Sequence, residues 1–294
     1  MALIHNATFD SGTRVLSLLD KAGNVISSCE VPSKELVDDI TKPLTFKAIQ
    51  DGSTVRLSTG YGSPSGDFQT SRDGGNTWVD YTESTTITLN TGDEVSFRAR
   101  SNRTSAQLAG SYFKFSMRGK IEAWHNVMSL YRTNDFATYN TVMSYAFTDL
   151  FRDCTSLTKA PVLPATTLAE GCYNNMFRGC STLTSAPELP ATTLATRCYD
   201  FMFLDCSSLT SVPELPATTL ATSCYSGMFR GCSKLKEIRV YATTTATDAL
   251  YEWLYRASST GDFYCDPNAT IFPSGVSGIP SGWTRRDIAD YPQT

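Results

Sequence analysis

The chain has 294 residues, with 25 Lys and Arg against 29 Asp and Glu, and a formal net charge of −4. A mildly acidic chain is a poor partner for nucleic acid, whose phosphates attract clustered Lys and Arg. Because the only histidines are His5 and His125, catalysis or metal binding that needs several imidazoles is nearly excluded. We therefore expect no cofactor and no metal.

The first 41 residues contain two apolar runs on either side of an Asp-Lys-Ala-Gly-Asn turn, in the segment RVLSLLDKAGNVISSCEVP. This pattern predicts a β-hairpin. Two interpretations fit it equally well: an attachment module that docks the chain to a larger assembly, or an edge hairpin that completes the next domain. The start of the chain lacks a cationic stretch followed by an apolar core, so we expect no secretory signal peptide. No apolar run reaches the length of a membrane-spanning helix.

Residues 42–108 show the alternation of β-strands in STVRLS, DFQTS, TWVDY, TTITLN and EVSFRAR, with turn residues between these segments. Short strands at this spacing predict a small antiparallel β-sandwich. Residues 109–145 follow, and we expect them to cover the open N-terminal edge of the repeats described next. His125 lies in this segment beside Trp124, where a packed or exposed role is expected rather than a catalytic one.

One turn of the predicted sandwich, SRDGGNTW, matches the Asp-box of sialidase-type propellers, with Ser71, Asp73, Gly75, Thr77 and Trp78 at the motif positions. A single box predicts a structural turn, in which Asp73 bonds turn amides, the glycines adopt positive φ and Trp78 packs beneath. The alternative is a glycosidase. That enzyme would need further boxes, an arginine cluster and a tyrosine nucleophile, and the sequence offers no such set, so we expect no catalytic residues.

Residues 146–240 contain three near-identical segments at a period of 26 residues, beginning at Leu163, Leu189 and Leu215. A partial copy, SYAFTDLFRDCTSLTKAPV, precedes them in the same register. Repeats of this length are typical of arrays in which each unit buries its apolar side chains only by stacking on its neighbours.

Within each repeat, the spacing of apolar residues predicts a helix followed by a short strand. In the second full copy, Leu194, Cys198 and Met202 recur at i, i+4 and i+8 after two threonines that are candidate N-caps. The helix is expected to end at Asp205, or at the equivalent glycine of the neighbouring copies. The segment that follows suits one strand of a short parallel sheet, which a proline makes irregular.

Seven of the nine cysteines fall at two positions of the repeat, and therefore form two columns in a stacked array. Side chains of one column point in parallel, so disulfides along a column are geometrically poor. Metal sites favour closely spaced pairs such as C-x-x-C, which the sequence lacks. We interpret the columns as buried structural ladders, with Cys154, Cys180, Cys206 and Cys232 in one and Cys172, Cys198 and Cys224 in the other.

Residues 241–294 begin with a helical pattern from Ala249 to Leu254 and continue with a Gly-, Pro- and Ser-rich tail. We expect this segment to cap the far end of the array, because the last unit of a stacked array otherwise exposes its core.

The Phe-x-Gly-Cys-x-x-Leu and Leu-Pro-Ala-Thr-Thr-Leu-Ala elements resemble BspA-type leucine-rich repeats, which occur in surface proteins of gut Bacteroidales and in proteins of phages that infect them. The likeness extends to PLTFKAIQDGSTVRL from Pro43, which is similar to a β-module that often precedes such arrays. It also includes GVSGIPSGW from Gly275, which looks like their C-terminal cap. The resemblance implies a leucine-rich-repeat solenoid.

Together these features predict an α+β fold class: N-terminal antiparallel β-sandwich-like modules followed by a short leucine-rich-repeat solenoid with a C-terminal cap. The expected domains are a hairpin or attachment module at 1–41, a small β-sandwich-like domain at 42–108, an N-terminal cap at 109–145, leucine-rich repeats at 146–240 and a C-terminal cap at 241–294.

If the repeats bind a partner, the resemblance to leucine-rich-repeat proteins implies that the strand side is the binding face. Near-identical repeats also fit a spacer that binds nothing. The positions of that side that vary in chemistry form the candidate ligand face, namely Lys159, Val162, Ser185, Glu188, Ser211, Glu214, Lys236 and Glu237.

The modular layout and the resemblance favour a non-enzymatic structural or adhesion protein. The first hypothesis is a phage virion component, a tail or head fibre or a decoration protein, assembled in the host cytoplasm and exposed on the particle exterior. Its expected partners are other virion proteins at the N-terminal region and a host surface protein or glycan, with no nucleic acid and no membrane insertion; a homo-oligomer is compatible with this. The alternatives are a bacterial cell-surface adhesin whose export signal is missing from this sequence, and the glycosidase suggested by the lone Asp-box.

Overall fold

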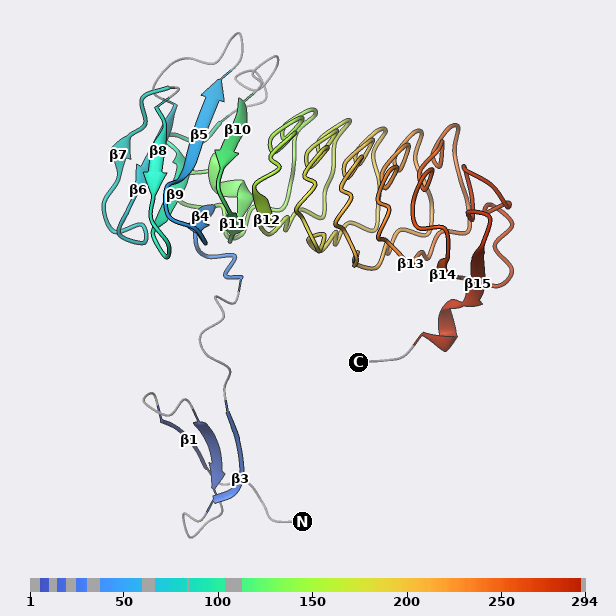
Figure 1. Cartoon of the computed structure of the whole chain (residues 1–294), viewed down its shortest axis with the longest axis horizontal. Coiled ribbons are helices and arrows are strands. Elements are labelled where there is room, and N and C mark those ends of the chain that lie inside the picture. Colours follow the sequence, from blue (N-terminus) through green and yellow to red (C-terminus); the bar gives the residue numbers. More distant parts are fainter. Residues whose placement is uncertain are drawn as a thin grey trace. The chain divides into compact units, whose positions relative to one another are not determined.

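The structure is a computed structural model, and it describes residues 6–10, 15–19, 25–30, 38–59, 67–83, 85–103 and 113–291. The chain divides into two compact units, Met1–Asp39 and Ile40–Thr294. Figure 1 labels most of the strands of each unit and colours the chain in sequence order.

In the first unit, strands β1 (Asn6–Asp10), β2 (Val15–Leu19) and β3 (Val25–Glu30) form one antiparallel sheet in the order β1-β2-β3 (Figure 1). Strands β2 and β3 are the two apolar runs for which the sequence predicts a hairpin, and they pair with each other. Strand β1 extends this pair to a three-stranded sheet, which the sequence pattern did not predict.

The second unit begins with two β-sheets. The larger has six strands in the order β12-β11-β4-β9-β6-β7, and the smaller has three in the order β10-β5-β8. All neighbours are antiparallel except β11 and β12, which are parallel. The strands are β4 (Thr45–Ala48), β5 (Ser53–Thr59), β6 (Phe68–Ser71), β7 (Val79–Asp80), β8 (Ile87–Leu89), β9 (Glu94–Ala99), β10 (Phe113–Arg118), β11 (Ile121–Trp124) and β12 (Leu157–Lys159).

Buried rings from the two sheets meet in one core. Phe97 of β9 lies edge-on to Phe115 of β10 with ring centroids 5.2 Å apart, and Phe46 of β4 lies 4.7 Å from Phe115. Phe68 of β6 contacts Phe113 of β10 in the same manner at 5.3 Å. Alternation places one face of each sheet in this core, an arrangement consistent with a β-sandwich.

The repeats continue directly from one edge of each sheet. Strand β12, in the partial repeat, pairs in parallel with β11. On the other sheet, the N–H of Phe115 in β10 donates to the carbonyl of Leu150 at 2.8 Å, and the ring of Phe115 stacks on Phe151 at 5.5 Å. The paired sheets are therefore the platform on which the first coil stacks, and β10 and β11 come from the segment predicted as a cap.

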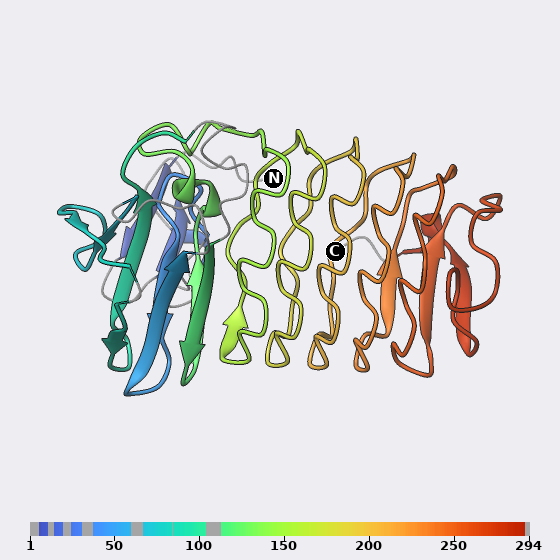
Figure 2. The same ribbon diagram turned by 90° about the horizontal axis from the view of Figure 1, so that it is seen from above.

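Each repeat forms one coil, and corresponding residues of successive coils lie side by side, as Figure 2 shows from above. The rings of successive coils are almost parallel, with centroids 5.4 Å apart between Phe177 and Phe203 and 5.6 Å between Phe203 and Phe229. A second column of stacked rings runs through the array alongside the first, formed by Phe147, Tyr173, Tyr199, Tyr225 and Trp253.

The predicted α+β class with a leucine-rich-repeat solenoid is wrong. The chain is 3% helical and 28% strand, and its strands form several sheets. In the part of the chain that the structure describes, the helical segments are two short 3-10 helices, η1 (Val127–Leu130) and η2 (Ile288–Asp290). The segments predicted as helices in the repeats, and the one from Ala249 to Leu254, consist of consecutive turns. In each repeat, the segment expected to be helical is therefore a run of consecutive turns, such as residues 196–205 in the second full copy. We call these runs the turn segments.

Residues with positive φ, spaced four apart, explain this difference. In the second full copy, Arg197, Phe201 and Asp205 have φ of 55°, 53° and 60°. A right-handed α-helix requires φ near −63°, and each left-handed residue other than glycine costs roughly 1–2 kcal/mol. The chain therefore changes direction at every fourth residue, and no α-helix can pass through these positions.

Backbone hydrogen bonds alternate along the turn segments. The N–H of Phe201 donates to the carbonyl of Ser226 in the next coil at 2.8 Å, whereas the N–H of Met202 closes a turn onto the carbonyl of Tyr199 at 3.2 Å. The bonds between coils offset much of the cost of the left-handed residues. Because the turns repeat every four residues, every fourth side chain points the same way, so an i, i+4 pattern does not distinguish them from a helix.

Three parallel strands, β13 (Glu237–Arg239), β14 (Gly261–Cys265) and β15 (Trp283–Asp287), lie at the C-terminal end of the array (Figure 1). Trp253 is buried there, donates from Nε1 to the carbonyl of Gly278 at 2.9 Å and stacks on Phe272. Among the described residues, none lies in a helix with the length and apolar character needed to cross a membrane.

Candidate functional site

The predicted ligand face follows the line of short parallel strands and bridges on one side of the coils. Ser185 and Ser211 are neighbours in an isolated parallel bridge, and Lys159 is the last residue of β12. One column of the face, spaced by the repeat period, contains Lys159, Ser185, Ser211 and Glu237, a second contains Val162, Glu188 and Glu214, and Lys236 precedes Glu237.

Much of the charge on this face is engaged within the protein. The Nζ of Lys159 lies 3.2 Å from the centroid of the Trp124 ring, a cation–π contact. Glu214 forms an ion pair with Arg239 at 2.8 Å. Glu188 is exposed and forms no ion pair with any described residue. The face therefore offers a partner few unengaged charges.

The Asp-box residues form a turn held by their own hydrogen bonds. Asp73 accepts from the N–H of Thr77 at 2.9 Å, from the hydroxyl of Thr77 at 2.6 Å and from the hydroxyl of Ser71 at 2.7 Å. The Nε1 of Trp78 donates to the carbonyl of Gly75 at 2.9 Å. The hydrogen bonds from Thr77 and Ser71 hold the pKa of Asp73 well below its usual value, so this carboxylate is ionised and fixed in the turn.

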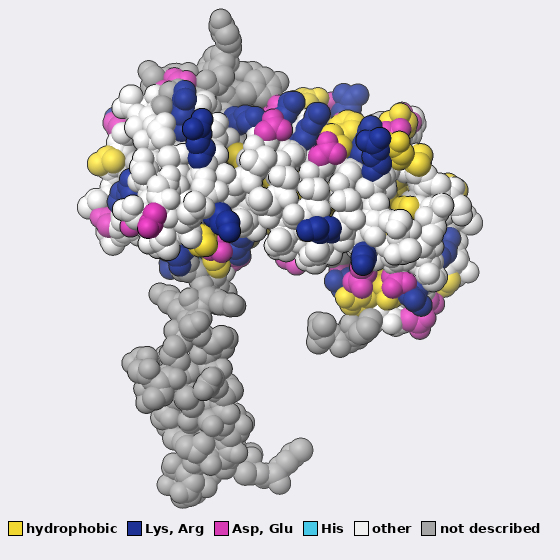
Figure 3. Space-filling model, in the orientation of Figure 1, with side chains coloured by type: hydrophobic (Ala, Val, Ile, Leu, Met, Phe, Trp, Pro, Cys, Tyr) yellow, Lys and Arg dark blue, Asp and Glu magenta, His cyan; other side chains and the backbone are white. Residues whose placement is uncertain are grey.

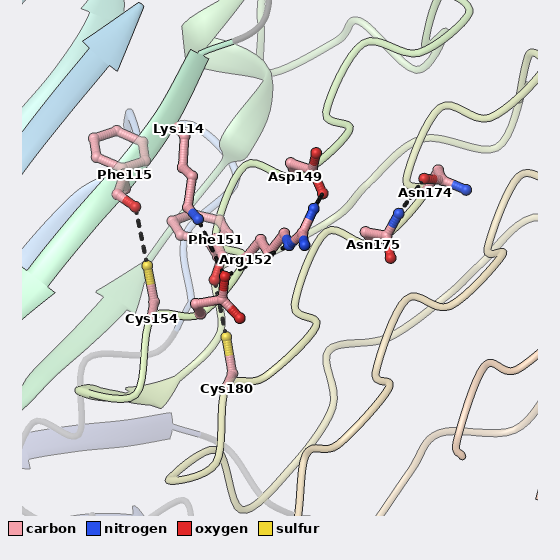
Figure 4. Close-up of polar contacts among 10 residues, drawn as sticks. Lys114, Phe115, Asp149, Phe151, Arg152, Cys154, Asn174, Asn175 and Cys180 are labelled. Atoms are coloured by element: carbon pink, nitrogen blue, oxygen red, sulfur yellow. Dashed lines mark hydrogen bonds and ion pairs between the residues drawn. The ribbon is translucent and has the colours of Figure 1, made fainter. Parts of the chain in front are cut away.

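The cysteines of both predicted columns are buried and form no disulfides. In the first column, each thiol donates to a phenylalanine carbonyl one step back along the stack. Cys154 donates to Phe115 at 3.2 Å and Cys180 to Phe151 at 3.1 Å (Figure 4), and the contact recurs twice farther along. These thiols therefore help to bind each coil to the one before it.

Burial makes these thiols chemically inert. It raises the pKa of the Cys154, Cys206 and Cys224 thiols to about 12, so the reactive thiolate is scarce at neutral pH.

No group of three or more His, Cys, Asp and Glu residues in the described part of the chain is placed to hold a metal ion. His125 is buried between β11 and η1, with a φ of 66°.

A pocket that the sequence did not predict lies on the turn segments, away from the predicted ligand face. Figure 3 shows Lys and Arg side chains along the upper margin of the repeats, mixed with acidic and hydrophobic ones, above a mostly uncharged wall. The pocket has a volume of about 330 Å³ and draws its lining from consecutive coils. Its lining residues are Arg178, Phe201, Leu204, Asp205, Arg230 and Arg256.

A signal for this pocket was present in the repeat alignment. Arg152, Arg178 and Arg230 occupy one repeat position, and Leu204 interrupts the series. Leu204 is buried and shorter than arginine, so the interruption leaves space between the arginines of the coils before and after it. A single change within a repeat is conspicuous only once the coils are known to stack at that position.

Arg152 and Arg178 occupy equivalent positions but have different surroundings. Arg152 pairs with Asp149 at 3.4 Å (Figure 4) and with Asp153 at 3.5 Å, both in its own coil. The residues at those two positions beside Arg178 are Asn175 and a glycine, and Arg178 forms no ion pair with the described residues. The guanidinium of Arg178 is therefore available to a ligand.

Asp200 is a buried carboxylate on the same turn segments. It accepts a hydrogen bond from the side-chain amide of Asn174 at 3.2 Å, while its other oxygen has no partner among the described residues. Burial raises the pKa of Asp200 to about 6, although the nearby Ser226 side chain and the charge of Arg197 act in the opposite direction. This carboxylate therefore destabilises the fold when it ionises near neutral pH.

No family model, curated protein or solved structure matches this chain. The resemblance to BspA-type repeats stays a prediction from the sequence.

Proposed function

We propose that the chain is a non-enzymatic structural and adhesion protein, carried on the exterior of a phage particle as a fibre or decoration protein, whose repeats contact a host surface protein or glycan. The observation that carries this proposal is the division into a small N-terminal unit, Met1–Asp39, and a larger unit of sheets and stacked coils. The small unit would attach the chain to the particle, and the larger unit would face outward.

The size of the first unit supports an attachment role. It consists of one three-stranded sheet within Met1–Asp39. A unit of roughly 40 residues buries little surface, and such units usually need oligomerisation or another support to be stable. Among the residues of this unit that the structure describes, no strand pairs with the outer edge of β1 or of β3, and strand edges readily pair with another chain. Other virion proteins, or further copies of this chain, would supply that support.

The second unit is suited to display because its coils are fixed to one another throughout. Ring stacking, thiol-to-carbonyl bonds and backbone hydrogen bonds connect each coil to the next. Such an array holds its exposed residues at constant spacing, which suits contact with a repetitive surface. The exposed face residues Ser185, Glu188 and Ser211 lie along one side of it.

The test is the location of the protein. Phage particles would be purified from a culture that produces the chain, analysed by mass spectrometry and labelled with antibodies against the repeats. We expect the chain in the particle with the repeats accessible from outside. Absence from particles together with labelling of the bacterial surface would favour the cell-surface adhesin instead. Absence from both locations would contradict an adhesion role.

A further inference from the structure

The pocket on the turn segments combines three cations with an apolar floor. Arg178, Arg230 and Arg256 line it, and Leu204 and Phe201 supply the apolar part of the lining. The ring-stacking steps of 5.4 and 5.6 Å that separate the coils of Arg178 and Arg230 set the width of the opening. A pocket of about 330 Å³ is at the small end of ligand sites, and suits one sugar-sized group rather than a large cofactor.

The charge balance of the pocket favours an anionic ligand. Arg178 has no ion pair with the described residues, and Arg256 is exposed with its guanidinium 5.4 Å from the Tyr255 ring. Arg230 is held by Glu252 at 2.5 Å, which fixes its direction. Asp205 is the acidic residue of the lining. Arginine binds carboxylate and sulfate groups through paired N–H donors, so two of these side chains remain for that purpose.

The apolar part of the lining is held in place by the neighbouring coil. The ring of Phe201 lies over Gly227, where an added Cβ would come within 2.2 Å of the ring. Only glycine at that position, which also has a φ of 56°, lets the ring lie this close. Phe201 therefore presents a fixed flat surface beside the arginines, against which the C–H face of a sugar ring can pack.

We propose that this pocket binds an acidic sugar residue of a surface polysaccharide, with the ring against Phe201 and Leu204. The carboxylate or sulfate of the sugar bonds Arg178, while Arg256 adds positive charge to the same lining and Asp205 accepts hydrogen bonds from sugar hydroxyls. This inference rests on the proposed adhesion function and identifies its ligand class.

Binding of defined oligosaccharides to the full-length chain tests the proposal. The probes are an oligogalacturonate, which carries carboxylates, a chondroitin sulfate oligosaccharide, which carries sulfates as well, and a neutral maltooligosaccharide. Titration calorimetry is expected to show binding of an acidic probe and none of the neutral one. The two acidic probes distinguish a carboxylate from a sulfate as the recognised group. Failure of the wild-type chain to bind either acidic probe overturns the proposal.

Variants locate the binding in the pocket. Arg178→Gln is expected to raise the Kd roughly tenfold, because a charge-assisted bond is lost. Leu204→Arg restores the regular series and fills the pocket, so it is expected to abolish binding while keeping a fold that the neighbouring coils already show. The matched controls are Arg152→Gln at the equivalent, carboxylate-paired position and Glu188→Lys on the predicted ligand face. A control that weakens binding as much as Arg178→Gln contradicts the pocket.

A separate assay of the same proteins on intact host cells distinguishes this inference from the proposed function. If the wild-type chain binds cells but no acidic probe, the pocket proposal fails and the adhesion function stands. If it binds an acidic probe through the pocket but is absent from particles and from cell surfaces, the adhesion function fails and the pocket stands.

Discussion

The β-sheets and the turn segments of the second unit both bury apolar side chains, but the sequence spacing of those side chains differs between them. In strand β9 the large apolar side chains of the core, Val95 and Phe97, recur at every second residue, whereas in a turn segment Cys198 and Met202, and likewise Tyr199 and Phe203, recur four residues apart. In both, backbone N–H groups bond a neighbouring segment of chain. Period two identifies a strand from sequence alone, but period four is shared by a helix and by a ribbon of four-residue turns.

The aromatic residues of the two regions differ as well. In the sheets, Phe46 and Phe97 meet edge-on at an interplanar angle of 79°, whereas Phe177 and Phe203 in the coils are nearly parallel at 4°. The sheet core is assembled from unlike positions and adopts the edge-on geometry that ring quadrupoles favour. In the coils, identical residues on identical backbones must have the same orientation, so repetition imposes parallel stacking.

The largest expected effect comes from removing one ring of the stacked column. Phe203→Ala leaves a cavity between two rings in a fully buried position, and is expected to lower the free energy of unfolding by about 3–5 kcal/mol. Urea denaturation measures the loss. Tyr251→Ala is the control, since that ring is exposed, and a change below about 0.5 kcal/mol is expected there. Equal effects at the two positions would show that the stacked column is not a core.

Replacing an aspartate by asparagine should have opposite effects on the stability of the protein at Asp200, in a turn segment, and at Asp73, beside the β-sheets. The pKa of Asp200 is raised to about 6, so the folded protein favours the protonated form of this carboxyl group. Its full contribution to stability is present below its unfolded pKa and is lost as the pH rises through about 6. Asp200→Asn is therefore expected to stabilise the protein at pH 7.5 by about 1–2 kcal/mol and to have little effect at pH 3.5.

Asp73, in the turn between β6 and β7, gives the contrast. Its pKa is lowered, so its stabilising effect is present above its unfolded pKa and is lost as the pH falls. Asp73→Asn is expected to destabilise the protein at pH 7.5. Thermal denaturation of both variants at the two pH values checks the signs. Destabilisation by Asp200→Asn at pH 7.5 would contradict a strained carboxylate in the turn segment.

The smallest expected effect distinguishes a turn segment from a helix at one residue. Ser223 has a φ of 53°. Gly171, the residue at the same position two repeats earlier, has a φ of 59°. Ser223→Gly is expected to be more stable than Ser223→Ala by about 1 kcal/mol, because glycine tolerates this φ. In a helix the order would be reversed by a similar amount, since alanine is then the better residue. Chemical denaturation of the two variants decides between these orders.

The sequence was sufficient for those parts in which pattern and structure correspond one to one. Alternation in EVSFRAR and STVRLS matches strands β9 and β5, and the repeat register matches the rings that stack. It was insufficient for the turn segments because left-handed φ at Arg197 and Phe201 leaves no mark in composition, where glycine is the usual sign. The pocket was missed for a related reason: Leu204 is significant only once Arg178 and Arg230 are known to flank it in space.

The conformation of the repeats is tested most directly by far-ultraviolet circular dichroism of the intact chain. The structure is 3% helical, so the spectrum is expected to lack the paired minima of α-helix at every temperature below unfolding. Strong helical minima that disappear in a single transition with the rest of the fold would contradict stacked coils of four-residue turns. The pocket between those coils would then have to be abandoned as well.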